Sequence, residues 1–322
     1  MSACPFPYTV RQYRDVVVTL KNGLRKPVKQ FIGTVSVPCG KCVACRRRKQ
    51  NEWAFRCMAE SRHSKSSYFV GLSYNDENLP ISDLGQPTLI KEHLQKHIKS
   101  LRDDLGELKF FGCGEYGDTF GRPHYHYLLF LKEDVHESKV RASIEKRWNK
   151  GFVDVDLGVT PANAKYCCKY ALKQVGFDYG DCVPPFALMS RRPGIGKGFL
   201  DEINVQDFRE RKQFVVHDVQ GTPYSIPRLY KEYIYTHNEC LDHTLLLNKI
   251  MNVKNESRLQ DYESASGLNF YKFDQDLILQ REKNFVKQLK RECYEFKFTP
   301  HYKQSRPRRE VNRGDDLKTD EF

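Results

Sequence analysis

The chain has 322 residues, of which 39% are hydrophobic and 29% charged, with a net charge of +12. This length allows about two domains, and the basic excess favours a polyanionic partner, nucleic acid before a membrane surface. There is no apolar run of the ~18 residues that a membrane span needs, and no secretory signal pattern. Eleven cysteines, an odd number, indicate reduced thiols or metal ligands in a cytoplasm rather than a disulfide framework.

A β-hairpin is predicted over residues 13–37, and a cysteine-rich loop follows it. Cys39, Cys42 and Cys45 are spaced three residues apart, which suits tetrahedral zinc, with Cys57 as the expected fourth ligand. An iron–sulfur cluster is less favoured because the usual fourth cysteine spacing is missing. Three reduced thiols in a turn remain the alternative.

A helix is predicted from Val43 to about His63, and its first turns are strongly basic. The basic residues are Arg46, Arg47, Arg48 and Lys49. They are expected to contact DNA phosphates, or else to form a solvated helical turn. Cations at this end oppose the helix dipole, which favours the functional interpretation.

The next segment predicts alternating strands and helices. The expected elements are a strand at 68–74, a helix capped by Thr88 and ended by Gly106, strands at 108–116 and about 123–130, a helix at 137–149, a strand at 153–159, and a helix that begins at Thr160-Pro161 and runs to 175. This order predicts an α+β fold, a ferredoxin-like antiparallel sheet backed by helices.

Two histidines one residue apart, His124 and His126, share one face of a predicted strand. Such a pair can clamp a divalent metal ion, although two polar residues on a solvated face is the plainer interpretation. If the turn between 117 and 121 closes a hairpin, one register sets Glu115 opposite His124 as a third ligand. Asp76 is a second candidate carboxylate.

The helix after Pro161 carries two tyrosines and two lysines on one stripe, Tyr166, Lys169, Tyr170 and Lys173. A phenol near its usual pKa of ~10 is a poor nucleophile. A nearby ammonium group or metal ion favours the phenolate and so attack on a phosphodiester. The alternative is that these side chains lie along the surface with their polar ends in water.

These motifs together resemble the HUH endonucleases, the rolling-circle replication initiators, and more closely the replication initiation protein of gokushoviruses of the Microviridae. The segments that carry the resemblance are 69–76, 123–126 and 166–170, with further similarity at 39–45, 114–117 and 190–196. The resemblance covers roughly residues 35–230.

The resemblance implies that His124 and His126 bind Mg²⁺ or Mn²⁺ and that Tyr166 and Tyr170 are the nucleophiles. It implies nicking of a single-stranded DNA origin, with a 5′-phosphotyrosine and a free 3′-hydroxyl, and later rejoining of the ends. A host helicase and DNA polymerase in the bacterial cytoplasm are the implied partners. A non-catalytic zinc protein that binds nucleic acid is the competing hypothesis.

Further basic residues, Arg122, Arg191 and Arg192, are predicted DNA contacts, the last two in a glycine-rich segment that is either a phosphate-binding loop or a turn. A hairpin is expected over 214–230 and a charged helical region after about 240. The predicted divisions are an N-terminal region at 1–67, an endonuclease core at 68–200, a C-terminal region at 201–298 and a mobile charged tail at 299–322.

Overall fold

The computed structural model describes residues 4, 7–40, 42–117, 121–170, 179–218, 221–266, 280 and 283. The side chains of residues 43, 169 and 170, and of several residues between 251 and 266, are outside that description. The predicted tail at 299–322 also lies outside the described residues. Within the described part of the chain, no helix is long and apolar enough to cross a lipid bilayer.

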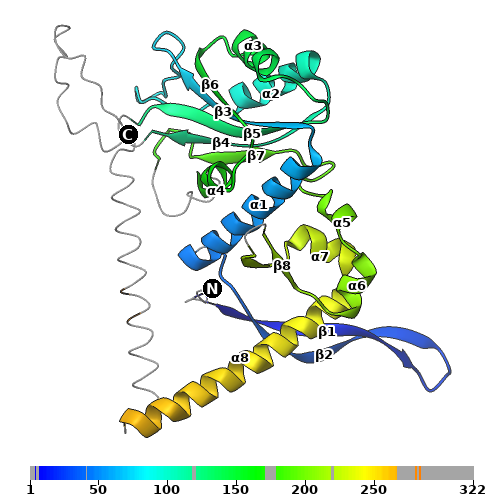
Figure 1. The fold of residues 1–322 in the computed structure, drawn as a ribbon. Coiled ribbons are helices and arrows are strands. Elements are labelled where there is room, and N and C mark those ends of the chain that lie inside the picture. The colour runs from blue at the N-terminus through cyan, green and yellow to red at the C-terminus, as the bar shows by residue number, and fades with distance from the viewer. Residues whose placement is uncertain are drawn as a thin grey trace.

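A five-stranded antiparallel sheet forms the centre of the molecule (Figure 1). Its strands are β3 (Ser66–Tyr74), β4 (Leu108–Tyr116), β5 (Pro123–Leu131), β6 (Gly151–Leu157) and β7 (Phe186–Met189). The spatial order is β6-β3-β5-β4-β7. The first four strands follow the β-α-β-β-α-β pattern, so the predicted ferredoxin-like α+β fold is confirmed. The edge strand β7 was not predicted.

Helices cover both faces of this sheet. They are α1 (Val43–His63), α2 (Lys91–Leu105), α3 (Glu137–Arg147) and α4 (Pro161–Tyr170). Helices α2 and α3 pack on one face, and α1 and α4 lie beneath the other (Figure 1). Successive residues of β5 alternate between the two faces, so Tyr125 and Tyr127 enter the α2/α3 core while His124 and His126 face α1 and α4.

The α2/α3 core depends on close packing around Tyr127. This side chain is fully buried, and its hydroxyl lies 2.9 Å from Nε2 of His97 on α2. Gly112 pairs with Tyr127 across β4 and β5, and a Cβ atom at Gly112 would lie only 2.8 Å from the Cβ of Tyr127. A glycine is therefore needed where the two strands and the tyrosine meet.

Lowering the pH is expected to destabilise the fold through His97. Burial lowers the pKa of His97 to about 4, whereas its ordinary value is 6.5. Between these values the unfolded chain binds a proton that the folded chain does not, so stability present above pH 6.5 is lost as the pH falls to about 4. The loss should reach about 3 kcal/mol.

Denaturant unfolding near neutral pH and near pH ~4 measures this loss. The His97→Gln variant keeps a polar group beside the Tyr127 hydroxyl but does not titrate. It should therefore lose less stability than the wild type on acidification. An equal loss in the two proteins would contradict the assignment to His97.

Helix α1 is shared between the sheet and a second, smaller core. Ala54 and Cys57 face the sheet, whereas Phe55 and Ala59 face a cluster of C-terminal elements. Those elements are α5 (Phe199–Glu202), α6 (Val205–Glu210), β8 (Val215–His217), β9 (Pro223–Ser225) and α7 (Arg228–Ile234). The predicted hairpin within 214–230 is therefore confirmed as the pair β8–β9.

The glycine-rich segment is docked on α1 by buried polar groups. Glu60 accepts a hydrogen bond of 2.7 Å from Gly196 N, and its other oxygen lies 2.7 Å from Lys109 Nζ. Arg56 donates to Ile195 O at 3.0 Å. Gly196 has a positive φ of 77°, and a Cβ atom there would lie 2.6 Å from Arg56 O. The residues at the segment's centre are thus packed against a helix.

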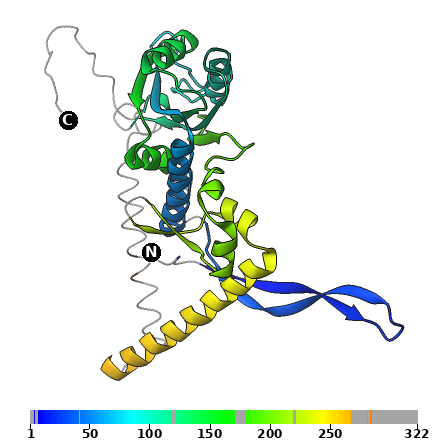
Figure 2. The same ribbon diagram turned by 45° about the vertical axis from the view of Figure 1, so that its right-hand side comes forward.

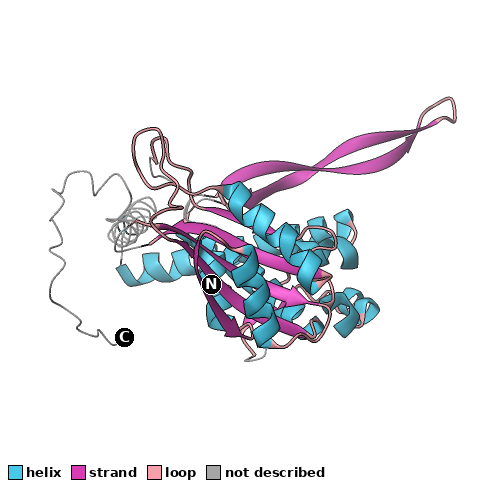
Figure 3. Ribbon diagram, turned by 90° about the horizontal axis from the view of Figure 1, so that it is seen from above, coloured by secondary structure: helices cyan, strands magenta, loops and turns pink. Residues whose placement is uncertain are grey.

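A long two-stranded hairpin, β1 (Tyr8–Thr19) and β2 (Arg25–Val37), projects away from the remaining elements (Figure 2). The view from above shows the same projection (Figure 3). The base of the hairpin is held by α8 (His237–Ser266), where Arg14 pairs with Asp242. The predicted hairpin and the predicted helical region after 240 are both confirmed for the described residues.

The predicted cap of α2 was wrong. The helix begins at Lys91, and its N-cap residue is Ile90, which makes no side-chain capping hydrogen bond. Thr88 Oγ1 instead accepts a hydrogen bond of 2.9 Å from Val183 N. A threonine hydroxyl can satisfy a tertiary backbone donor as readily as a local one, so the side chain alone did not locate the helix start.

Candidate active site

The site begins with the hairpin of β4 and β5, where Glu115 pairs with His124. Residues directly opposite each other in antiparallel strands project from the same face, and His126 is on that face as well. The Nε2 atoms of His124 and His126 each lie 3.2 Å from Glu115 Oε1. Glu115 is 2% exposed, so its carboxylate is buried beneath the two imidazoles. The predicted hairpin register is confirmed.

Neighbouring groups fix both imidazoles. His124 Nδ1 lies 3.0 Å from Arg122 O, a carbonyl that can only accept, so Nδ1 carries a proton. The His126 ring stacks on Phe69 of β3, with centroids 5.4 Å apart and an interplanar angle of 8°. Burial and then the charge on His124 lower the pKa of His126 to about 3, so His126 is neutral at pH 7. A neutral imidazole can ligate a metal ion.

The three side chains form a donor set that suits a divalent cation. With Nδ1 of neutral His124 protonated, Nε2 is a lone-pair atom 3.2 Å from an oxygen of Glu115. Two lone-pair atoms at this distance repel each other unless a proton or a cation lies between them. The ligand atoms of Glu115, His124 and His126 all lie within 4.8 Å of one another. Their arrangement therefore fits one metal ion.

Tyr166 reaches this group from α4. Thr160 Oγ1 caps the helix by accepting from Asn163 N at 3.2 Å, so the predicted start is confirmed. Cys167 and Cys168 are buried against the sheet, which leaves Tyr166 on the outer side of the helix with 37% of its surface exposed. The Tyr166 hydroxyl donates a hydrogen bond of 2.9 Å to Glu115 Oε1.

Further contacts hold Tyr166 over the histidines. Its ring meets the ring of His126 edge to face, with centroids 5.0 Å apart, and the ring of Phe69 at 6.2 Å. Gln50 of α1 donates to the carbonyl of Lys165 at 2.8 Å and so links the basic helix to the residue before Tyr166. Phe69 was not singled out from the sequence. Its position in the strand that pairs with β5 was the one signal that could have found it.

The remaining residues of the predicted tyrosine stripe cannot be placed in the same way. The side chains of Lys169 and Tyr170, and Lys173 as a whole, lie outside the described part of the structure. Their roles remain predictions.

The second candidate carboxylate, Asp76, is elsewhere. Its side chain is 92% exposed and pairs with the Arg122 guanidinium at 2.8 Å. Arg122 also donates to Tyr74 O at 2.8 Å, so this arginine braces the end of β3 beside the hairpin. Among the described acidic residues, Glu115 joins the two histidines and Asp76 does not.

The predicted DNA contacts lie on two surfaces. Arg47, Arg48 and Lys49 are exposed on the first turns of α1, and Arg46 is half-buried there. Arg191 and Arg192 are exposed at the start of the docked glycine-rich segment. Their contact with DNA remains a prediction, since exposure alone does not show what binds.

The predicted zinc ligand Cys57 was wrong. Cys57 lies twelve residues after Cys45 on the same helix, which separates them by about 18 Å along the axis. It is buried between α1 and α4 with Cys168. The thiol that lies beside Cys39, Cys42 and Cys45 belongs to Cys4. No spacing pattern pointed to Cys4, which is 35 residues before Cys39.

Comparison with known proteins places this architecture in a family. The family model of the replication-associated protein ORF2 matches residues 67–175, which span β3 to α4 and contain the site. The replication-associated protein ORF2 of Spiroplasma virus 4 is 32% identical over 222 residues, covering 63% of this chain and 68% of the relative. The chain belongs to the replication-associated protein family.

Two other replication-associated proteins are also similar. Protein VP4 of Bdellovibrio phage phiMH2K is 28% identical, covering 65% of this chain and 70% of the relative. Protein ORF4 of Chlamydia phage 1 is 27% identical, covering 64% of this chain and 54% of the relative. The resemblance to the Microviridae proteins drawn from the motifs is therefore confirmed.

One solved structure was also matched, the hypothetical protein ORF119 from Sulfolobus islandicus rod-shaped virus 1. It covers 38% of this chain and 97% of its own at 16% identity, with a TM-score of 0.26. A TM-score this low carries no conclusion about a shared fold.

Proposed function

We propose that this replication-associated protein initiates rolling-circle replication by nicking single-stranded origin DNA with Tyr166. One observation carries the proposal: the Tyr166 hydroxyl donates to the Glu115 oxygen that also lies 3.2 Å from both His124 and His126. A nucleophile and a metal-ligand set thus share one atom. Phosphodiester transesterification needs both groups in such proximity.

Each side chain then has a defined task. His124, His126 and Glu115 would hold the cation, and their mixed nitrogen and oxygen donors favour Mn²⁺ over Mg²⁺, which prefers oxygen ligands. When bound, the cation supplies positive charge to the non-bridging oxygens of the scissile phosphate. Phe69 keeps the His126 ring in place by stacking on it. Glu115 orients the Tyr166 hydroxyl and provides an acceptor for its proton.

The covalent step conserves one phosphodiester bond. The Tyr166 oxygen forms a bond to phosphorus, and the bond from phosphorus to the 3′ oxygen breaks. The product is a 5′-phosphotyrosine and a 3′-hydroxyl that takes up a proton. Attack by a 3′-hydroxyl on the phosphotyrosine reverses the chemistry and joins the ends, so no ATP is required. Tyr170 is the expected second nucleophile.

Charge supports a DNA substrate. The chain has a net charge of +12, and exposed arginines and lysine occupy the start of α1, whose Gln50 contacts the residue before Tyr166. A nicked origin offers its 3′-hydroxyl to a host DNA polymerase, and strand displacement requires a host helicase. We place this activity in the cytoplasm of an infected bacterium.

A nicking assay tests the proposal. Single-stranded oligonucleotides that tile the replicon encoding this chain are incubated with the full-length protein and Mn²⁺ or Mg²⁺. We expect cleavage at one site with protein bound to the 5′ end, and loss of cleavage when EDTA removes the cation. Binding without cleavage in either metal would instead support a non-catalytic nucleic-acid-binding protein.

A further inference from the structure

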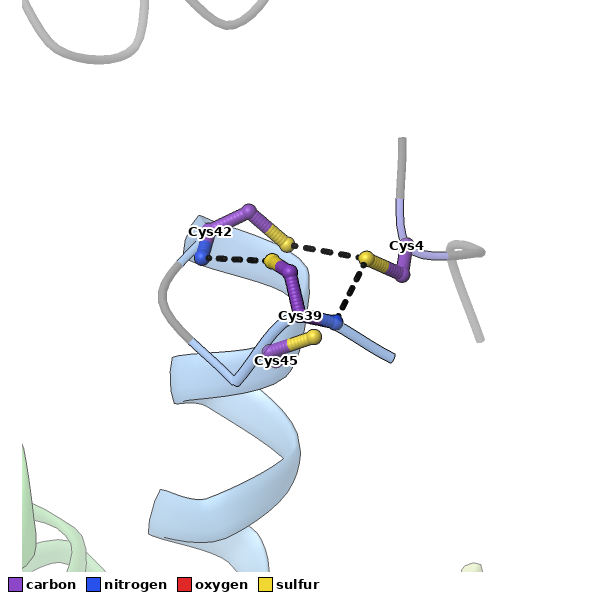
Figure 4. A group of neighbouring side chains, drawn as sticks. All are labelled: Cys4, Cys39, Cys42 and Cys45. Atoms are coloured by element: carbon purple, nitrogen blue, oxygen red, sulfur yellow. Dashed lines mark hydrogen bonds between the residues drawn. The ribbon is translucent and has the colours of Figure 1, made fainter. Parts of the chain in front are cut away.

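A second group of metal ligands lies outside the active site. The Sγ atoms of Cys4, Cys39, Cys42 and Cys45 all lie within 4.8 Å of one another (Figure 4). We propose that these four thiolates bind one structural Zn²⁺ ion and that Cys4 completes the site. The proposal is independent of the nicking chemistry, because none of the four cysteines belongs to the ligand set of Glu115, His124 and His126.

The spacing of the thiols is that of a tetrahedral ion. Zinc–sulfur bonds of ~2.3 Å in a tetrahedron place neighbouring sulfurs about 3.8 Å apart. The Sγ atoms of Cys42 and Cys4 are 3.7 Å apart. A disulfide would bring two sulfurs to ~2.05 Å, and all four cysteines are free thiols. A four-iron cluster would hold its thiolates farther apart than the observed group.

Backbone groups already orient the ligands. Cys39 N donates to Cys4 Sγ at 3.3 Å, and Cys42 N donates to Cys39 Sγ at 3.3 Å (Figure 4). Amide donors to cysteine sulfur stabilise thiolate charge. These contacts therefore support the sulfurs of two ligands from outside the coordination sphere, as metal sites usually require.

Charge at the start of α1 gives an independent argument. The N-cap residue is Cys42, which makes no side-chain capping hydrogen bond, and the first turn contains no acidic residue. Four exposed or half-buried cations follow at residues 46–49. A Zn²⁺ ion with four thiolates has a net charge of −2, which the helix dipole and these cations would stabilise. The site supplies the negative charge that this helix end otherwise lacks.

The ion would join three separate pieces of chain. Cys4 comes from the N-terminal segment, Cys39 follows the end of β2, and Cys42 and Cys45 begin α1. Apart from α8, the described structure shows little that holds the projecting hairpin to the body (Figure 2). Zinc binding would therefore fix the base of the hairpin beside the basic residues of α1.

Metal analysis of the full-length protein tests the site. We expect one zinc per chain after expression in zinc-supplemented medium, and the same content in the His124→Ala/His126→Ala double variant. The partly exposed Cys4 is the ligand best suited to substitution. Cys4→Ser should weaken zinc binding at least about tenfold in competition with a chromogenic chelator, whereas Cys57→Ser should leave it unchanged.

Cobalt substitution provides a second measurement that does not depend on the variants. Co²⁺ bound by the wild type should show the intense sulfur-to-cobalt charge-transfer absorption of a tetrathiolate site, which a site of two imidazoles and a carboxylate cannot produce. Wild-type protein without zinc or this absorption would overturn the proposal. Unchanged zinc affinity in Cys4→Ser would overturn the assignment of the fourth ligand.

Discussion

Replacing Tyr166 with phenylalanine is expected to abolish the covalent adduct between this protein and origin DNA. The variant keeps the ring that contacts His126 and Phe69 and removes only the hydroxyl bonded to Glu115. Loss of a covalent nucleophile costs as much as ~10⁶ in kcat in a well-studied hydrolase. We expect the rate of the first cleavage to fall at least about 10³-fold, measured by single-turnover nicking with a 5′-labelled strand retained on the protein.

Two matched variants control this experiment. Tyr233→Phe removes the hydroxyl of another exposed tyrosine, on α7, and should cleave like the wild type. Tyr170→Phe should retain the first cleavage and lose the second, because the hydrogen bond to Glu115 belongs to Tyr166. Wild-type adduct formation by Tyr166→Phe would rule out Tyr166 as the first nucleophile.

Removing one member of the ligand set is expected to weaken Mn²⁺ binding at least about a hundredfold, since changes even to groups outside the coordination shell cost ~10–100-fold. The variants are His126→Ala and Glu115→Gln. Glu115→Gln retains a carbonyl oxygen near both histidines but removes the charge, and it should also slow the first cleavage. Titration calorimetry with Mn²⁺ measures the affinity, and nicking measures the rate.

His217→Ala is the control for these substitutions, because His217 is an exposed imidazole on β8. It should bind Mn²⁺ as the wild type does. Thermal unfolding without metal separates lost ligation from lost structure. Unchanged Mn²⁺ affinity in both His126→Ala and Glu115→Gln would contradict the metal site.

Local pattern was enough to predict the centre of the site. Alternation along β5 placed His124 and His126 on one face, and the length of the turn set Glu115 opposite His124. The start of α4 followed from a threonine cap and a proline at the first helical position. These features depend on neighbours in sequence or on a single hairpin, so a single sequence reveals them.

Other features depend on tertiary contacts that leave no local signal. Cys4 joins Cys39 only when the chain has folded, and β7 is a four-residue strand whose place is set by pairing with β4. Phe69 stacks on His126 because β3 lies beside β5. The error at Cys57 was avoidable, because the rise of a continuous helix already separates it from Cys45.

Mapping the covalent adduct to a residue tests the central claim most directly. The protein is allowed to cleave a single-stranded origin oligonucleotide, the bound DNA is trimmed with nuclease, and tryptic peptides are identified by mass spectrometry. Trypsin cleaves after Lys165 and Lys169, so Tyr166 and Tyr170 fall in different peptides. We predict a nucleotide on the peptide of residues 166–169 after the first cleavage. Its presence only on the Tyr170 peptide, or cleavage without any adduct, would contradict the account.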